Sequence, residues 1–195
     1  MNIDDEVKVF ATGYDWLLCD NEIFKRGDLS TGAKISHHQT LKSEVNLKSA
    51  AFIKYESHIF ILVAQPHNYG VHVYKYDAAK DIFKEYMSIL FKKKVGLSKT
   101  GYIKSWVKDI NCLEFLYALQ DSKIFKIDLN KMLKLKPSLD DQLYEAEIIY
   151  ENRVAGIEHF MLVPGYNNNR LLVQNKCMVA IYEISIQKYL NRLKQ

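Results

Sequence analysis

Short apolar runs at regular distances along the 195-residue chain constrain its fold more than any other feature. Each run is followed by a polar turn and then by a segment in which apolar and polar residues alternate, ending in an acidic residue. Short apolar runs and strict alternation are both typical of β-strands. The acidic residues Asp28, Asp77, Asp128 and Glu183 are 49, 51 and 55 residues apart, so the chain repeats one strand-rich unit.

The two kinds of strand differ in their expected burial. Residues 71–76 and 124–127 alternate, which predicts third strands covered on one face only. The continuous apolar runs predict inner strands buried on both faces; they are residues 16–19, 59–64, 115–119 and 170–173. Two segments fit this pattern less well. Residues 77–92 fit either a strand or a short helix, and residues 186–195 predict a short C-terminal helix.

A period near 50 residues, with three or four short strands in each unit, favours the blades of a β-propeller. One small sheet cannot bury both of its faces alone, so successive sheets stack face to face around an axis. The prediction is an all-β, propeller-like array in a single domain, residues 1–195. Its alternative is an antiparallel β-sandwich or barrel with evenly spaced strands. The predicted units are approximately residues 7–48, 49–98, 99–152 and 153–195.

The acidic residues lie in segments that resemble a known repeat. From Gly27 and Asp28 to Ile35, the chain is similar to the turn after the third strand of a WD-repeat blade. That family has Trp-Asp there, followed by a hydrophobic residue, a small polar pair and Gly. The pairs that occupy the same place in later units are Tyr76-Asp77, Ile127-Asp128 and Tyr182-Glu183. No unit has the Trp, and Gly-His dipeptides are absent, so the resemblance implies a degenerate WD-like propeller.

The number of units has a consequence for partners. Four units stand at the small end of the roughly four to eight blades of propellers. The chain therefore forms either a compact four-unit assembly or an incomplete ring. An incomplete ring exposes apolar faces and strand edges at both ends, which invite pairing. We expect a protein partner or a second copy of the chain to cover these open ends.

Composition narrows the class of protein further. No apolar run approaches the length of a membrane span, and the acidic start fits neither a signal nor a transit peptide, so no membrane association is expected. Cys19, Cys112 and Cys177 are far apart and lie in or beside apolar runs. This pattern predicts reduced, buried thiols and an intracellular location, cytoplasmic or nuclear.

The sequence contains no recognisable catalytic arrangement. Nucleotide-binding, hydrolase and metalloprotease motifs are absent, and the adjacent His37 and His38 point to opposite faces if they lie in a strand. The prediction is therefore a protein that is not an enzyme and has no cofactor or metal. Its expected function is that of a non-catalytic protein–protein interaction scaffold, a subunit of a larger intracellular complex.

Partner contacts are expected in the loops at one face of the array, because rigid blades leave loops free to vary. The candidate partner-binding residues are His67, Tyr69, Lys92, Lys93, Lys94, Tyr166, Asn175 and Lys176. The three consecutive lysines fit either a solvated loop or a weak phosphate-contacting patch. The second reading supports an alternative function, a nucleic-acid-associated accessory subunit in RNA processing or modification. Against it, the chain has 23 lysines but only 4 arginines, and arginine is the usual residue of nucleic-acid recognition.

Overall fold

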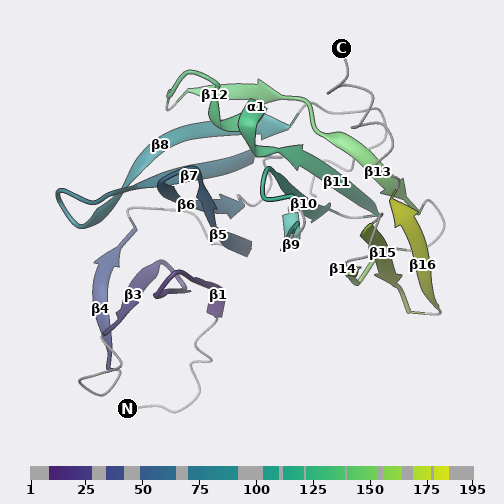
Figure 1. Ribbon diagram of the computed structural model, residues 1–195, viewed down its shortest axis with the longest axis horizontal. Coiled ribbons are helices and arrows are strands. Elements are labelled where there is room, and N and C mark those ends of the chain that lie inside the picture. The colour runs from purple at the N-terminus through teal and green to yellow at the C-terminus, as the bar shows by residue number, and fades with distance from the viewer. Residues whose placement is uncertain are drawn as a thin grey trace.

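The computed structural model gives the positions of most strands of the chain (Figure 1). It describes residues 9–27, 34–41, 49–64, 70–91, 103–109, 112–120, 122–138, 140–152, 156–163, 169–176 and 178–184. The described residues form four sheets and one short helix, and no sheet closes into a barrel. The fold is therefore all-β and blade-like, as the repeat predicts, rather than a barrel.

The first two sheets are antiparallel meanders of consecutive strands. Sheet A contains β1 (Val9–Gly13), β2 (Trp16–Cys19), β3 (Glu22–Arg26) and β4 (Ile35–Thr40). Sheet B contains β5 (Ser49–Tyr55), β6 (His58–Ala64), β7 (Gly70–Asp77) and β8 (Ile82–Phe91). Because β8 is a long strand, the segment 77–92 does not form the helix that its pattern also allowed.

In the third and fourth sheets, too, neighbouring strands are antiparallel. Sheet C contains β9 (Ile103–Lys108), β10 (Phe115–Gln120), β11 (Lys123–Asp128) and β13 (Glu147–Glu151). Sheet D contains β14 (His159–Val163), β15 (Asn169–Gln174) and β16 (Val179–Ile184). Between β11 and β13, the strand β12 (Asp141–Tyr144) pairs in parallel with β8, so this segment ties sheet B to sheet C. The predicted C-terminal helix lies outside the described residues.

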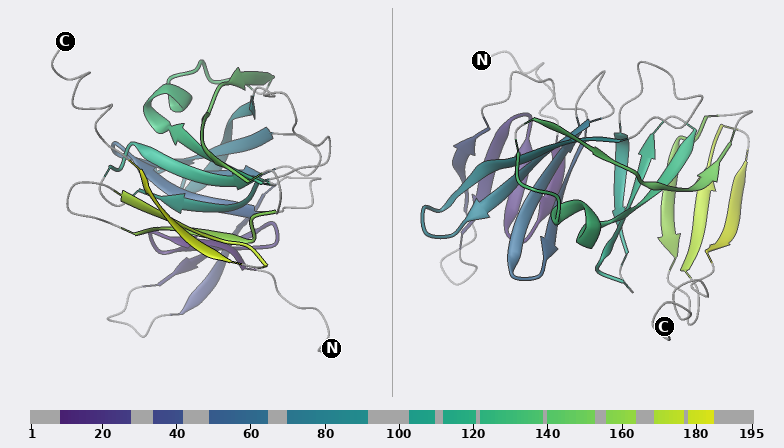
Figure 2. Two further views of the ribbon diagram at one scale, coloured as in Figure 1. Left: turned by 90° about the vertical axis from the view of Figure 1, so that its right-hand side faces the viewer. Right: turned by 90° about the horizontal axis from the view of Figure 1, so that it is seen from above.

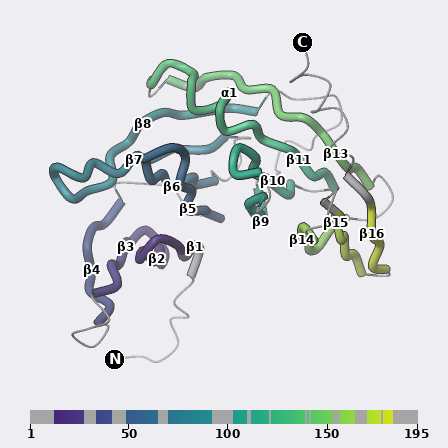
Figure 3. The backbone as a smooth tube through the Cα atoms, viewed as in Figure 1, coloured from purple at the N-terminus to yellow at the C-terminus, as the bar shows by residue number. Residues whose placement is uncertain are grey.

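The sheets fan out in an open arc, with β1, β5, β9 and β14 on its concave side (Figures 1 and 3). Seen from above, they follow one another in chain order as separate layers (Figure 2). The inner strands also touch in this order, β1 against β5, β5 against β9 and β9 against β14. Gly13 permits one close approach, because a Cβ atom there would lie 3.3 Å from the Cβ of Phe52. That the four sheets make up a single domain stays a prediction.

Each pair of neighbouring sheets encloses a separate hydrophobic core. Trp16 and Leu18 of sheet A pack against Ile61 of sheet B. The other face of sheet B packs against sheet C through side chains such as Leu62 and Leu116, and the remaining cluster joins sheets C and D. Burial of apolar area on both faces is the main force that holds such stacked sheets together.

The burial of the strands confirms one expectation and corrects another. The second strands of sheets A, B and C are buried over most of their length, most clearly β10, in which all six residues are buried, whereas β15 has exposed residues at Arg170 and Gln174. The third strands of the two inner sheets, β7 and β11, are more buried than their alternation predicts, because a neighbouring sheet covers each face, whereas β16 keeps an exposed face. In β11, for example, the Lys126 ammonium lies 4.0 Å from the centre of the Phe115 ring, and burial lowers the pKa of this lysine.

Two of the repeated acidic residues cap the turn that follows a third strand. Asp77 ends β7, and its Oδ1 accepts hydrogen bonds from the N–H groups of Ala79 (3.1 Å) and Lys80 (3.3 Å). Asp128 ends β11 and is the N-cap of α1 (Leu129–Leu133), where its Oδ1 accepts the N–H of Lys131 at 3.1 Å. Asp28 lies outside the described residues, as does the side chain of Glu183.

Loss of this cap should destabilise the connection between β11 and β12. Asp128→Ala leaves an N–H of the first turn without its acceptor, and we expect a loss of about 1 kcal/mol in the free energy of unfolding, measured by urea titration. Asp128→Asn keeps the accepting oxygen and should stay close to the wild-type value. Equal losses for the two variants would contradict a capping role.

Candidate functional site

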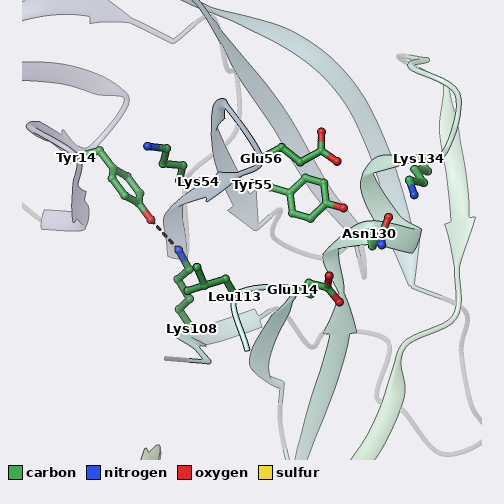
Figure 4. Close-up of a pocket in the computed structure, with 9 residues that line it drawn as sticks. All are labelled: Tyr14, Lys54, Tyr55, Glu56, Lys108, Leu113, Glu114, Asn130 and Lys134. Atoms are coloured by element: carbon green, nitrogen blue, oxygen red, sulfur yellow. Dashed lines mark hydrogen bonds between the residues drawn. The ribbon is translucent and has the colours of Figure 1, made fainter. Parts of the chain in front are cut away.

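A cavity of about 640 Å³ opens where the first turns of three sheets converge (Figure 4). This size lies within the range of roughly 300–1,000 Å³ that is typical of ligand-binding clefts. The β1–β2 turn contributes Tyr14, and the segment between β9 and β10 contributes Leu113 and Glu114. The remaining lining residues come from the β5–β6 hairpin, the end of β9 and the α1 region: Lys54, Tyr55, Glu56, Lys108, Asn130 and Lys134. We call this feature the turn cavity.

The turns that line the cavity have an uncommon backbone. Tyr14 and Asp15 have φ angles of 51° and 70°, and Glu56 has a φ of 53°. Non-glycine residues seldom adopt this left-handed conformation, and each costs of the order of 1–2 kcal/mol. The first turn is held by Arg26, whose N–H donates to the Asp15 carbonyl at 2.8 Å and whose guanidinium pairs with the Asp15 carboxylate at 2.5 Å. This fixed turn directs the Tyr14 side chain toward the cavity, as Figure 4 shows.

One contact crosses the cavity from the first sheet to the third. The Lys108 ammonium donates a hydrogen bond to the Tyr14 hydroxyl at 2.8 Å (Figure 4). The same ammonium lies 5.5 Å from the centre of the Tyr14 ring, a distance that places it beyond the hydroxyl and not over the ring face. These two residues are 94 positions apart in the chain, so only the stacking of the sheets brings them together.

Charges of both signs line the cavity without neutralising one another. Within the described part of the chain, no ion pair joins Lys54, Glu56, Glu114 or Lys134 to an opposite charge. Figure 4 shows the ammonium groups of Lys54 and Lys108 on the side of Tyr14, and the carboxylates of Glu56 and Glu114 on the side of Tyr55. The cavity therefore offers a cationic side next to Tyr14 and a side of mixed charge next to Tyr55, where Figure 4 also shows Lys134.

The environment of Tyr55 favours its neutral form. Burial raises the pKa of the Tyr55 phenol above its usual value, and the carboxylates of Glu56, Glu114 and Asp128 raise it further. A tyrosine phenol is protonated at neutral pH, and the raised pKa keeps it so in more alkaline solution, so Tyr55 can donate a hydrogen bond as well as accept one. Tyr55 thus gives its side of the cavity a flat apolar wall with a polar tip.

Most of the residues selected from the sequence lie outside the described residues: His67, Tyr69, Lys92, Lys93, Lys94 and Tyr166. Their contact with a partner stays a prediction, and so does the nucleic-acid alternative that rests on the three lysines. Asn175 is buried in the β15–β16 turn, where its Oδ1 accepts the N–H of Met178 at 2.8 Å and its own N–H donates to the Met178 carbonyl at 3.0 Å. Lys176 is exposed beside it. The structure brings neither residue to the turn cavity.

The cavity is built from turns after first strands, whereas the sequence reasoning selected loops after second strands and between units. The missed residues carried only weak signals. Tyr55-Glu56 and Cys112-Leu113-Glu114 stand next to turns and combine an apolar with a charged side chain, which is common at surfaces. The helix α1 had a clearer signal, an Asp followed by apolar residues at 129, 132 and 133.

The described residues show no cluster suited to metal chemistry. Among them, no group of three or more His, Cys, Asp or Glu side chains could hold a metal ion. Cys19 and Cys112 are free thiols, and burial raises the pKa of both.

Within the described part of the chain, no helix is long and apolar enough to cross a membrane. The absence of an enzymatic activity stays a prediction.

The fold and the turn cavity define an all-β protein of four stacked, blade-like sheets with a mixed-charge cavity near the inner strands. No family model matches this chain, and no curated protein matches it. Membership of the WD-repeat family therefore stays a prediction.

Solved structures resemble the chain at low sequence identity. The extracellular domain of a one-component system from B. thetaiotaomicron has a TM-score of 0.51 at 14% identity, over 93% of this chain and 21% of that chain. This likeness shows a shared fold, in which the chain spans about a fifth of the solved one. A chain of the yeast heterotrimeric nucleoporin complex has a TM-score of 0.43 at 15% identity, over 73% of this chain and 36% of that chain. A likeness at this level defines neither the fold nor the function of the present chain.

Proposed function

We propose that the protein is a non-catalytic interaction module that binds a segment of a partner protein in the turn cavity and serves as a subunit of a larger assembly. One observation carries this proposal: three sheets place aromatic, cationic and anionic side chains around one cavity, and four of the charged groups have no ion-pair partner among the described residues. Rigid sheets that present such turns are a common platform for recognition.

The chemistry of the cavity specifies the kind of segment it would hold. An acidic side chain of the segment would meet Lys54 and Lys108, and a basic side chain would meet Glu56 and Glu114. An apolar or aromatic side chain between them would contact Tyr14, Tyr55 and the exposed Leu113. Aromatic anchors supply much of the binding energy of interfaces, while charges at the rim supply orientation and specificity.

The proposal is tested by recovery of partners from native cells with a tagged chain. We expect a stoichiometric protein partner whose recovery falls by about tenfold with Lys54→Glu, because the reversal places a carboxylate where the segment's acidic group binds. Glu114→Lys should have a similar effect from the other side. Lys54 and Glu114 make no ion pair within the described residues, so thermal stability should be unchanged.

The matched control is Lys176→Glu, an exposed lysine of the β15–β16 turn that does not line the cavity. This variant should recover the partner as the wild type does. Loss of the partner with Lys176→Glu but not with Lys54→Glu would refute the turn cavity as the site and favour the loops after second strands. Recovery that is independent of both variants would also refute it.

A further inference from the structure

Among the residues that the structure describes, no sheet packs against one face of each of the two end sheets of the arc. Within the array, every sheet has a leading face, toward the preceding sheet, and a trailing face, toward the next one. Trp16 and Leu18 show that the trailing face of sheet A is buried against sheet B, and Phe160 and Leu162 show that the leading face of sheet D is buried against sheet C. The leading face of sheet A and the trailing face of sheet D therefore stand at the open ends (Figure 1).

The trailing face of sheet D has an apolar centre, and His159, Arg170 and Gln174 lie on the same face around it. Met161, Leu172 and Ile181 are paired in register across the three strands, so their side chains form one row on the same face. Val163 and Val179 flank this row. In β14 the burial alternates strictly: Phe160 and Leu162 are buried against sheet C, while Met161 on the opposite face is 51% exposed. Ile181 is 63% exposed and Val179 is 61% exposed.

The leading face of sheet A has a matching apolar centre. Leu17 alternates with the buried Trp16 and Leu18, so it points away from sheet B, and it pairs in register with Phe24. Phe24 lies opposite His37, whose ring contacts it edge-on at 5.7 Å. Ile35 pairs with Arg26, two residues after Phe24, and therefore shares this face, where it is 63% exposed.

The three internal interfaces show what these two faces are suited to contact. In each of them, the trailing face of one sheet packs on the leading face of the next: A on B, B on C and C on D. Contact between the trailing face of sheet D and the leading face of sheet A from another molecule would repeat the same arrangement. Exposed apolar patches rimmed by polar residues often mark sites of association between proteins.

We propose that two copies of the chain close into one ring of eight sheets, in which sheet D of each copy packs on sheet A of the other. A two-fold axis relates the two contacts, so one arrangement of the two copies covers the leading face of sheet A and the trailing face of sheet D in both. Eight sheets lie within the roughly four to eight blades of closed propellers. A contact between two copies of sheet D alone would cover only one end of each arc and leave the leading face of sheet A exposed.

The test is the molar mass of the purified chain by light scattering. We expect twice the 22.8 kDa of one chain. Ile181→Asp on the trailing face and Ile35→Asp on the leading face should each raise the dissociation constant by about 100-fold or more, because a carboxylate then lies in an apolar contact. The control is Leu143→Asp: Leu143 is 62% exposed on β12, away from both faces, and this variant should remain dimeric.

Mixing the variants distinguishes this ring from other assemblies. A pair made of one Ile181→Asp chain and one Ile35→Asp chain keeps one wild-type contact, so the mixture should recover part of the dimer that each variant alone has lost. A monomeric wild type would overturn the proposal. A dimer that Ile35→Asp does not weaken, or an oligomer larger than a dimer, would overturn it as well. Ile35 and Ile181 are exposed, so circular dichroism should show that both variants are folded. Leu172→Asp gives a second test of the trailing face of sheet D. The ring contacts are separate from the turn cavity, so their failure leaves the proposed partner site standing.

Discussion

Replacement of Trp16 by alanine should lower the free energy of unfolding by about 3–5 kcal/mol, the usual cost of removing a large buried aromatic side chain. Trp16 is only 5% exposed and lies between sheets A and B. Its ring contacts the rings of His38, Tyr76 and Phe83 at centroid distances of 4.6, 5.4 and 5.1 Å. The substitution leaves a cavity among these side chains that the two sheets can fill only by moving closer together and repacking.

Urea unfolding monitored by circular dichroism measures this loss, because the chain has only two tryptophans and fluorescence would change with the substitution itself. The conservative control is Trp16→Phe, which keeps a ring in the same place and should cost far less. Because Trp16 belongs to the core between sheets A and B, and sheet A lies at one end of the array, we also expect hydrogen exchange to rise first in sheet A. A loss below about 1 kcal/mol for Trp16→Ala would contradict the packing described.

Removal of Glu151 should destabilise the protein by about 3 kcal/mol, whereas replacement of its partner Lys123 by methionine should be nearly neutral. The Lys123 ammonium lies 3.3 Å from the Glu151 carboxylate, and the Lys123 side chain is only 5% exposed. The two residues face each other across the β11–β13 pairing. Without Glu151, the buried ammonium loses its counter-charge and water cannot reach it freely.

Lys123→Met has a smaller cost than removal of Glu151. It leaves the Glu151 carboxylate without its partner, but the Glu151 side chain is more exposed than that of Lys123 and can be hydrated. Lys123→Met also keeps an unbranched apolar chain in the buried position. The measurement is the urea midpoint of Glu151→Ala, Lys123→Met and the double variant. The double variant should be more stable than Glu151→Ala alone. The opposite order, with Lys123→Met the more damaging change, would show that the ion pair does not govern this site.

The sequence predicted the strands well because the physical signal is local. An apolar run such as residues 59–64 must be buried wherever it lies, and β6 is buried over most of its length. Alternation at residues 71–76 likewise identified β7, although it could not show that neighbouring sheets cover both faces of a third strand. Residues 77–92 were ambiguous because apolar spacing alone does not distinguish a short helix from a strand; pairing with β7 and β12 made them β8.

The turn cavity was less accessible to sequence reasoning. Tyr14, Tyr55 and Leu113 belong to turns of three different units, and nothing in the spacing of the chain shows that these turns meet. The contact of Lys108 with Tyr14 depends on the angle between successive sheets in the array. The loops selected from the sequence had similar composition, so composition could not decide between the two sets.

By itself, the sequence determined most strands of the four units and the acidic turns at Asp77 and Asp128, because alternation, apolar runs and turn residues act over a few residues. Only the tertiary structure decided the open arc, the cavity between three first turns and the apolar faces left at both ends. These features depend on how one sheet packs on the next, and the apolar side chains that drive this packing are non-directional in their preference for burial. The same apolar pattern fits a buried face and an exposed one, and only the position of a sheet in the array distinguishes Leu119, buried between sheets C and D, from Ile181 at the open end.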